Sequence, residues 1–383
     1  MALNVVSSDR LGTNVKTSNF APVLSDKLGV SKNLIINGSM VVAQRGTSST
    51  TSGYGSVDRW KVNFGGTDEA VTHAQVALTS SDTGPWAEGF KKALQLTNGN
   101  QTSGAGAADY IEVDQEIEAQ NVVNSAWETT STSSYVTLSF WVKSSIAQNF
   151  YGYLRSNDNT KQLYCFQTGS LSANTWTKVT KTIPGAAAIN IDNDNGAGIL
   201  LRLLPFYGTD MTGTRPLNAW ATYDSAARTP DSTATWYTTN DATFEITGLQ
   251  LEVGDTATDF EHRSYQDEWL RCVRYFWMAA DGADGTNLNN GVATAWSSSD
   301  ARVQYRHPVP MRASPSLYQV DGTDYWKLYF GGGTMLSDAV GSKKGNTQFT
   351  EVTFTDDVST TAGFAGWLRV NNAAARLGLN AEL

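Results

Sequence analysis

The 383-residue chain has few charged residues, few histidines and almost no cysteine. Charged residues make up 17% of the sequence, and there are 3 histidines and 2 cysteines. Three histidines leave little room for a metal cluster or a catalytic triad, and the motifs HExxH, CxxC, GxSxG, GxxxxGK[ST] and GxGxxG are absent. The sequence therefore contains no linear motif for metal-dependent, nucleophilic or nucleotide-dependent catalysis.

The chain also lacks long apolar runs and runs of basic residues. No window reaches the roughly eighteen apolar residues of a membrane span, so we expect no membrane insertion. The formal charge is −9 and the pI about 4.9, so we expect no nucleic acid as a partner. The first residues, MALNVVSSDRLGTNVK, lack a basic start followed by an apolar segment, so we expect no standard export signal.

The two cysteines, Cys165 and Cys272, are isolated and form no framework. This pattern favours two buried free thiols in a protein made in a reducing cytoplasm. The sequence alone leaves a disulfide between them open.

What the chain does contain is β-type sequence, with 34 glycines, only 9 prolines and many Ser, Thr and Asn residues. In "SYVTLSFWVKSS" the residues Val136, Leu138, Phe140 and Val142 alternate with polar neighbours, which predicts a strand with one buried face. Many short strands of this kind, with no helical pattern between them, predict an all-β fold dominated by an antiparallel sandwich.

Changes in this pattern divide the chain into three segments. Residues 1–32 have only scattered apolar side chains, which is typical of a disordered tail or of an arm that orders by lying on a neighbouring subunit. Residues 33–262 form the predicted sandwich. In residues 263–383 a linking helix comes first, because Trp269, Val273, Phe276 and Trp277 share a helical face and Ser264 with Asp267 resembles a capping box. A smaller C-terminal β-domain follows.

The acid-rich segment "YIEVDQEIEAQ" would place Glu112, Asp114, Glu116 and Glu118 on one face of a strand. Four like charges repel one another unless water or a cation screens them, so we expect a solvated strand face. A calcium site and a catalytic acid pair of the glycosidase type are the alternatives.

The turn "NIDNDNGAG" contains weak calcium candidates, Asp192, Asp194 and Asn195. It lacks the bidentate Glu of an EF-hand loop, and an Asx-rich turn that hydrogen-bonds its own backbone gives the same pattern. We expect no catalytic residues and no cofactor, with structural calcium as the weaker alternative.

The most charged stretch, "LQLEVGDTATDFEHRSYQDEWLRCVRYF", divides into a last sandwich strand, a turn and the capped helix. Glu261, His262 and Arg263 fall between strand and helix. We therefore interpret these three residues as an interdomain junction, and predict that His262→Ala weakens domain docking or assembly while it leaves any ligand binding largely intact.

Several separated motifs, in one order, resemble a known family. They are "NLIINGSMVVAQRGTS", "VDRW", "VDQEIE", "VTLSFWVKSS", "NTWTKVTKTIPG", the stretch from Phe244 to Phe276, "HPVPMRASPSL" and "LGLNAEL". The order is similar to that of bacteriophage tail-fibre and virion structural proteins. The resemblance covers residues 33–383. It implies a jelly-roll domain similar to carbohydrate-binding modules, then a smaller β-domain, on a phage particle.

The resemblance implies a non-enzymatic virion protein, made in the bacterial host cytoplasm and located on the tail or particle surface. We expect a tail fibre or short appendage that recognises host-surface glycans, attached to tail or capsid proteins through residues 1–32, and by family analogy a homotrimer. A capsid decoration or connector protein without glycan binding is the alternative, and a polysaccharide depolymerase is a further one.

Glycan binding would use aromatic platforms, since the chain has 12 Trp and 11% aromatic residues. Tyr54, Trp86, Trp220 and Trp236 stand in polar, loop-like surroundings and are the candidate glycan-contacting aromatics. The competing interpretation for each is a packing or interface residue.

Overall fold

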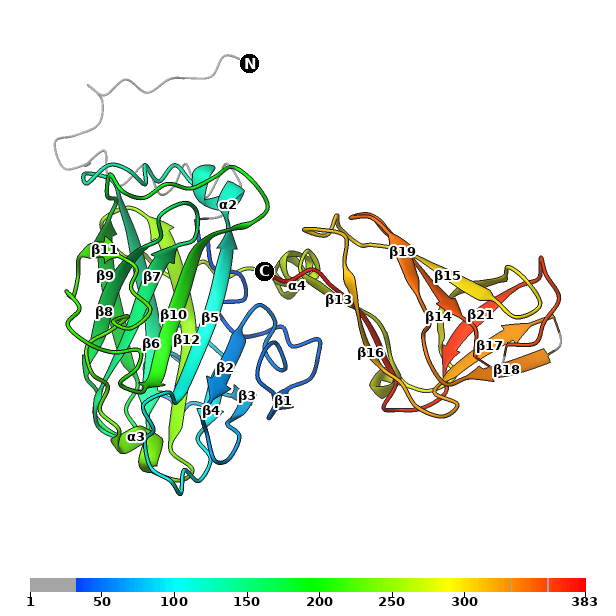
Figure 1. Ribbon diagram of the computed structural model, residues 1–383, viewed down its shortest axis with the longest axis horizontal. Coiled ribbons are helices and arrows are strands. Elements are labelled where there is room, and N and C mark those ends of the chain that lie inside the picture. Colours follow the sequence, from blue (N-terminus) through cyan, green and yellow to red (C-terminus); the bar gives the residue numbers. More distant parts are fainter. Residues whose placement is uncertain (1–31, 332, 357) are drawn as a thin grey trace, which may run out of the picture.

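A computed structural model of the chain describes residues 32–331, 333–356 and 358–383. Two β-sandwich parts are joined at helix α4 (Tyr265–Val273), as Figure 1 shows. The predicted docking arm lies outside the described residues except for Lys32, whose Nζ donates hydrogen bonds to Thr258 Oγ1 and the Asp259 carbonyl, both at 2.6 Å. Within the described ranges, no helix has the length and apolar character to cross a membrane.

The larger part consists of two antiparallel six-stranded sheets that enclose the main core. The first sheet contains, in spatial order, β1 (Ser48–Ser49), β3 (Thr72–Ala77), β4 (Lys92–Thr97), β12 (Thr243–Val253), β6 (Tyr135–Ser144) and β9 (Thr177–Pro184). The second sheet contains β11 (Trp220–Thr222), β8 (Gln162–Ser170), β7 (Asn149–Ser156), β10 (Ala197–Tyr207), β5 (Tyr110–Glu118) and β2 (Lys61–Gly65). The chain passes repeatedly between the sheets, and this confirms the predicted jelly-roll sandwich.

Strand β6 shows how the sequence pattern produces this core. Val136, Leu138, Phe140 and Val142 are all 0% exposed, as their alternation predicts. On β12 the side chains of Phe244, Ile246, Leu249 and Leu251 are buried as well. The pairing of β12 with β6 shifts by one residue between Thr247 and Gln250, where Gly248 has a φ of 66°. Because of this β-bulge, the apolar side chains on both sides of it point into the core although their spacing in the sequence changes by one residue.

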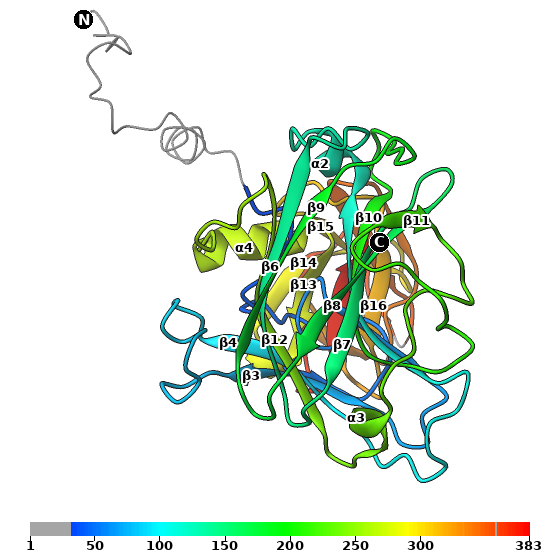
Figure 2. The same ribbon diagram turned by 90° about the vertical axis from the view of Figure 1, so that its left-hand side faces the viewer.

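Two short helices close opposite ends of the sandwich, as Figure 2 shows. They are α2 (Ala119–Val123) and α3 (Thr235–Thr238). The predicted linking helix is confirmed as α4, because Ser264 is its N-cap and Ser264 Oγ accepts a hydrogen bond from the Asp267 amide at 3.2 Å. The predicted helical face is wrong beyond Val273, since Phe276 and Trp277 lie on strand β13 (Phe276–Asp281) and pair there with Asn380 and Leu379.

The C-terminal part is a second, smaller sandwich with its own core, and a short 3-10 helix, η3 (Gly282–Asp284), follows its first strand. Its three-stranded sheet contains β13 (Phe276–Asp281), β22 (Arg376–Asn380) and β16 (Ser316–Val320). Its seven-stranded sheet contains β18 (Gly333–Ser337), β17 (Trp326–Phe330), β21 (Ala365–Val370), β14 (Asn289–Ala295), β15 (Ala301–Arg306), β20 (Phe349–Phe354) and β19 (Lys343–Gly345).

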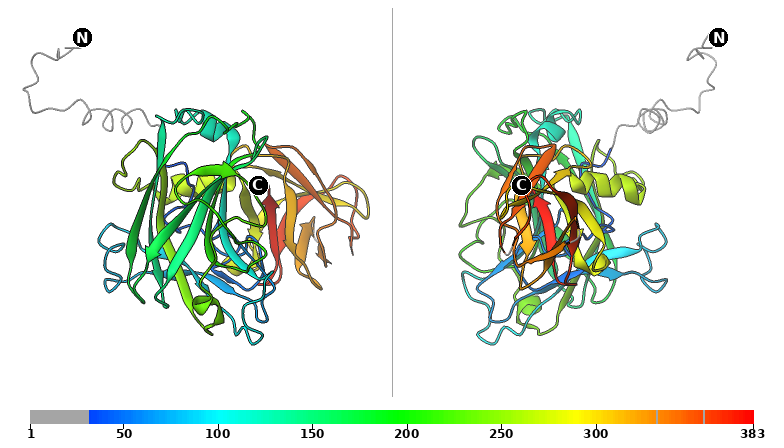
Figure 3. Two further views of the ribbon diagram at one scale, coloured as in Figure 1. Left: turned by 60° about the vertical axis from the view of Figure 1, so that its left-hand side comes forward. Right: turned by 90° about the vertical axis from the view of Figure 1, so that its right-hand side faces the viewer.

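The end of the chain returns to the junction of the two parts, as Figures 1 and 3 show. Strand β22 is central in its sheet, and Leu377 and Leu379, which alternate with Arg376, Gly378 and Asn380, are 0% exposed. Beyond it, Glu382 forms ion pairs with Arg45, at 3.4 Å, and with the buried Arg59. Residues of the larger part therefore hold the C-terminal segment directly.

Both cysteines are buried and free, which confirms the predicted thiols. Cys165 lies on β8 and Cys272 on α4. Burial raises the pKa of the Cys165 thiol to about 12, so this side chain packs as a small apolar group and is not a nucleophile.

Candidate functional site

The four candidate aromatics do not lie together. The expectation that Trp236 lies at the surface is wrong. Its side chain is 0% exposed and packs between the sheets from α3, and its indole N–H donates a hydrogen bond to the Thr243 carbonyl at 2.9 Å. Threonines surround Trp236 in the sequence, so its local polarity conceals its place in the core.

Two of the other candidates are half-buried packing residues. Trp220 donates to the Pro184 carbonyl at 2.7 Å, and its ring lies 5.5 Å from that of Tyr164. The hydroxyl of Tyr54 donates to the Leu383 carbonyl at 3.3 Å, at the junction of the two parts. Neither ring is a free platform in this arrangement.

Trp86, in contrast, lies beside two tryptophans that were not candidates, Trp141 and Trp176. All three are half-buried and pack against a small apolar cluster formed by Leu78, Phe90 and Ala93. This cluster is separate from the main core and lies outside it, on the first sheet. We call the three indoles, together with Asp82, Glu88, Lys91, Lys143 and Lys178, the tryptophan surface.

Three segments far apart in the sequence form this surface. Trp141 points outward from β6, where it pairs in register with Lys178 of β9, and Trp176 directly precedes β9. The connection between β3 and β4 folds over them and carries Trp86. Gly84 (φ 100°) lies against Trp141, since a Cβ at Gly84 would be 2.7 Å from the indole ring.

Carboxylates fix the edges of two of the indoles. Trp141 Nε1 donates to Glu88 Oε2 at 3.0 Å, and Trp176 Nε1 donates to Asp82 Oδ1 at 3.0 Å. Both acids also bind lysines, since Lys178 lies 2.9 Å from Glu88 and Lys143 lies 3.2 Å from Asp82. The rings are therefore held in defined orientations by groups that are themselves polar and solvent-accessible.

A lysine ammonium lies over each ring. The distances from Nζ to the ring centroid are 3.2 Å for Lys91 over Trp86, 4.8 Å for Lys143 over Trp176 and 5.7 Å for Lys178 over Trp141. Lys91 is exposed, and exposed cation–π contacts are worth about 0.5–1 kcal/mol, so a ligand that stacks on Trp86 can displace this side chain at low cost. Lys143 and Lys178 are also held by ion pairs with Asp82 and Glu88.

Asp82 is the most strongly perturbed acid of this surface. Partial burial opposes its ionisation, but hydrogen bonds from Trp176, from the Thr79 amide and from Lys143 prevail and lower the pKa of Asp82 to about 2. The carboxylate is therefore ionised across the physiological range and acts as a permanent hydrogen-bond acceptor.

The acid-rich strand β5 differs from the sequence-based expectation. Glu112, Asp114 and Glu118 are 6%, 4% and 0% exposed, so the prediction that they lie on a solvated strand face is wrong. Of the four acids, only Glu116 is half-exposed. The burial of the other three is explained by arginines from distant segments, which replace the water that we expected to screen the charges.

Arg202 of β10 is the partner of the first two acids. Its Nε lies 2.5 Å from Asp114 Oδ1, and its Nη1 lies 2.7 Å from Glu112 Oε2 and 2.9 Å from the Tyr153 hydroxyl. Burial, followed by the charge of Asp114, raises the pKa of Glu112 to about 7.

Apolar side chains close this outer face of the second sheet. Tyr153 and Leu163 are 0% exposed there, and Met211, Leu217 and Tyr223 of the segment after β10 pack against them. The ion pairs of Arg202 with Glu112 and Asp114 therefore lie inside the protein. Their geometry does not support the alternative that these acids form a catalytic pair of the glycosidase type.

Glu261 and Arg263 of the predicted junction attach the start of α4 to the larger part. Glu261 Oε2 accepts from the Asn33 amide at 2.8 Å and from Arg263 Nη2 at 3.0 Å. Arg263 also donates to the Asn33 carbonyl at 2.7 Å and pairs with Glu268 at 3.4 Å.

His262 contacts the tryptophan surface and not the second sandwich. Its Nε2 lies 2.8 Å from the Glu88 carbonyl, and its ring lies 5.2 Å from Phe90 and 5.0 Å from Phe260. The expectation that His262 fixes one domain against the other is therefore wrong: its ring supports the connection between β3 and β4.

The calcium candidates form local hydrogen bonds, and one of them, Asn195, contacts the C-terminal part. Asp194 Oδ1 accepts from the Gly196 amide at 2.8 Å, as in an Asx turn, while Asn195 and Arg312 exchange hydrogen bonds of 2.7 and 3.0 Å. Asp192 donates its amide to Asp158 at 3.0 Å. In residues 32–331, 333–356 and 358–383 no cluster of three or more His, Cys, Asp or Glu residues is placed to hold a metal ion.

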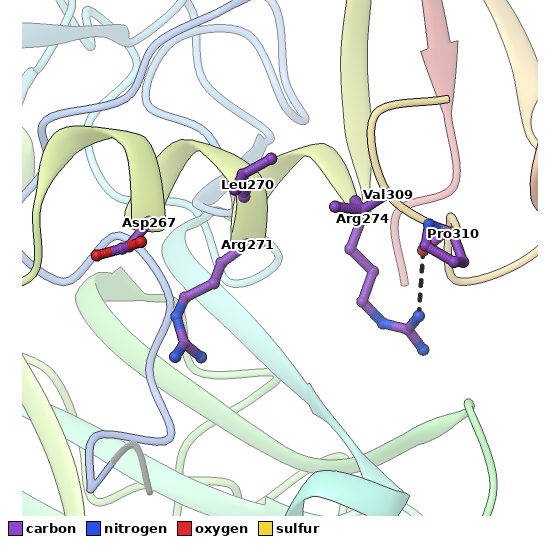
Figure 4. Close-up of a pocket in the computed structure, with 6 residues that line it drawn as sticks. All are labelled: Asp267, Leu270, Arg271, Arg274, Val309 and Pro310. Atoms are coloured by element: carbon purple, nitrogen blue, oxygen red, sulfur yellow. Dashed lines mark hydrogen bonds between the residues drawn. The ribbon is translucent and has the colours of Figure 1, made fainter. Parts of the chain in front are cut away.

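A hollow of about 460 Å³ lies beside α4, where the two parts meet (Figure 4). Its lining is Asp267, Leu270, Arg271, Arg274, Val309 and Pro310. Arg274 reaches across it and donates to the Pro310 carbonyl at 3.4 Å. None of the six residues is aromatic, so the hollow lacks a stacking platform.

Comparison with known proteins gives distant structural matches. No family model and no curated protein matches the chain. An enzymatically active tailspike domain of bacteriophage CBA120 is 12% identical over 58% of this chain, with a TM-score of 0.30, and this chain spans only 21% of that one. A putative sugar-binding protein from Bacteroides thetaiotaomicron is 12% identical, covering 58% of this chain and 100% of its own, with a TM-score of 0.31.

A third match is TmCBM61, solved in complex with β-1,4-galactotriose. It is 10% identical, covers 59% of this chain and 100% of its own, and has a TM-score of 0.29. Identities and TM-scores this low assign neither a family nor a ligand. The chain's own sheets define its class, an all-β protein with a jelly-roll sandwich as its larger part.

Proposed function

We propose that the protein is a non-enzymatic carbohydrate-binding appendage of a phage particle, and that the tryptophan surface contacts the glycan. One observation carries the binding proposal: the fold brings Trp86, Trp141 and Trp176 from three separate segments onto one polar, solvent-accessible surface outside the main core. The resemblance of the ordered sequence motifs to phage tail-fibre proteins supports the virion location.

The chemistry of the surface suits a neutral or mixed-polarity sugar. Indole faces stack on the C–H faces of pyranose rings, while hydroxyls require nearby donors and acceptors. Asp82 and Glu88 supply acceptors, and Lys91, Lys143 and Lys178 supply donors within the same few ångströms of the rings.

The proposed arrangement on the particle follows the family analogy. Residues 1–32 attach the protein to tail or capsid proteins, a homotrimer presents the sandwiches outward, and the chain is made in the host cytoplasm. Neither a cofactor nor catalysis is part of this proposal.

A glycan array of bacterial capsular and lipopolysaccharide sugars tests the proposal. We expect the purified protein to bind a restricted set of glycans, and the same signals to fall in a Trp86→Ala variant but not in a Tyr265→Ala variant. Tyr265 is a suitable control because it is 62% exposed and lies on α4. Absence of any glycan signal, together with tight docking to purified virions, would favour a decoration or connector protein. Release of reducing ends from a bound polysaccharide would favour a depolymerase.

A further inference from the structure

The C-terminal sandwich carries a second aromatic surface, on the outer face of its seven-stranded sheet. Tyr329 of β17, Trp367 of β21 and Val292 of β14 are direct register partners in one row across three neighbouring strands. They are 41%, 44% and 57% exposed, whereas the residues on the opposite face of these strands form the core.

Other large apolar side chains of the same sheet and its loops are also exposed. Trp296, which follows β14, is 65% exposed, and Phe349 of β20 and Phe364, which precedes β21, are each 46% exposed. Soluble proteins seldom leave this many large apolar side chains together in water unless the face binds something.

Arginines and a lysine accompany these rings. Lys327 and Arg369 pair in register next to the aromatic row, and Arg369 lies 5.3 Å from the Tyr329 ring centroid. Arg306 lies 6.0 Å from the ring centroid of Phe349. Two of these cations donate hydrogen bonds to neutral side chains: Lys327 donates to an Asn287 oxygen at 3.0 Å and Arg369 to an Asn289 oxygen at 2.8 Å.

Two acidic side chains, Asp300 and Glu351, lie beside this face, and both pair with Arg302. Arg302 is ion-paired with Asp300 at 2.9 Å and with Glu351 at 3.4 Å. Within the part of the chain that the structure describes, no ion pair is recorded for Lys327, Arg306 or Arg369. The face is therefore locally cationic on a protein whose net charge is −9.

This charge selects the class of ligand. Two copies of the face would bring like charges together, which disfavours self-association through it. A duplex nucleic acid would be repelled by the rest of this acidic chain. A carboxylate-bearing polysaccharide satisfies both properties of the face, since its sugar rings stack on flat aromatics and its carboxylates pair with separate cations.

We propose that this face, formed by Lys327, Tyr329, Trp367, Arg369 and Val292 with Arg306 at its side, is a binding site for a carboxylated polysaccharide. It is separate from the tryptophan surface, and the proposal does not depend on that surface. The protein then has two carbohydrate sites with different charge preferences, one on each sandwich.

Affinity electrophoresis in gels that contain polygalacturonate tests this proposal, with uncharged dextran gels as the reference. We expect polygalacturonate to retard the full chain, and Trp367→Ala or Arg369→Gln to weaken its apparent affinity by about tenfold or more. Lys161→Gln is the matched control, because Lys161 is exposed on the other sandwich. Unchanged thermal melting of each variant would show that it is folded, and Trp86→Ala should leave this retardation intact.

Three outcomes would overturn the proposal. The first is equal retardation of wild type and Trp367→Ala by polygalacturonate. The second is equal binding to polyaspartate or duplex DNA, which would show that charge alone is recognised. The third is a concentration-dependent oligomer, seen by analytical ultracentrifugation and abolished by Trp367→Ala, which would identify the face as a contact between copies of the chain.

Discussion

Glu118 of β5 accepts two hydrogen bonds from Arg274, from Nε and Nη2, both at 2.7 Å, where α4 leads into the C-terminal sandwich. The neighbouring Tyr275 hydroxyl donates to the same carboxylate at 2.5 Å. Burial opposes the charge of Glu118, but these hydrogen bonds prevail and lower its pKa. This buried carboxylate is therefore one of the groups that connect the two sandwiches, together with Glu382 and Asn195.

Replacing Glu118 with Ala should therefore destabilise the protein. The buried acceptor is lost for both Arg274 and Tyr275, and we expect the free energy of unfolding to fall by about 3 kcal/mol. That value is at the low end for a buried pair because Arg274 is 30% exposed and can be rehydrated. Urea denaturation measures the change, with Glu116→Ala as the half-exposed control on the same strand. A similar loss in both variants would contradict this role.

The pH dependence of stability should include a contribution from Glu112. Its pKa rises from 4.5 to about 7 on folding, so the folded state binds the proton more tightly than the unfolded state. The free energy of unfolding should therefore decrease as pH rises between these two values and level off above them.

The Tyr207 hydroxyl donates a hydrogen bond to Glu112 Oε2 at 2.5 Å. Glu112→Gln removes the titration of Glu112 while it keeps the shape of the side chain and an acceptor for Tyr207. Urea denaturation at several pH values between about 4.5 and 8 should give a flatter profile for the variant, which should gain stability relative to wild type at the alkaline end. Parallel profiles for the two proteins would show that Glu112 does not titrate in this range.

His262→Ala should act on the tryptophan surface and not on the contact between sandwiches. Loss of the bond to the Glu88 carbonyl and of the ring contacts with Phe90 and Phe260 should speed amide hydrogen exchange in residues 79–91. Exchange at Arg274 and Tyr275 should be unchanged. Faster exchange at those two residues alone would restore the interdomain role predicted from the sequence.

Local patterns in the sequence were sufficient to predict β6 and the start of α4, but not to predict which distant side chains contact each other. The alternation of Val136 to Val142 predicts β6, and the capping spacing of Ser264 and Asp267 predicts α4. The buried state of Asp114 and Glu118 could not be predicted, because their arginine partners are 88 and 156 residues away in the chain.

The candidate site was only partly predictable for a similar reason. Trp86 was a candidate because of its polar surroundings, and Trp141 could have been added, since it alternates outward with Ser139 and Lys143 on the predicted strand. That these residues meet depends on how the connection between β3 and β4 folds over the sheet, and no periodic pattern encodes that fold. Trp236 was misassigned because its neighbours in the sequence are polar, whereas its neighbours in space are apolar.

The central claim is that the tryptophan surface binds a glycan, and calorimetric titration of the strongest array ligand tests it most directly. The account predicts that Trp86→Ala and Trp176→Ala each weaken binding by about tenfold or more, while Tyr265→Ala binds as wild type does and all three variants melt as folded proteins. Equal dissociation constants for wild type, Trp86→Ala and Trp176→Ala would contradict it.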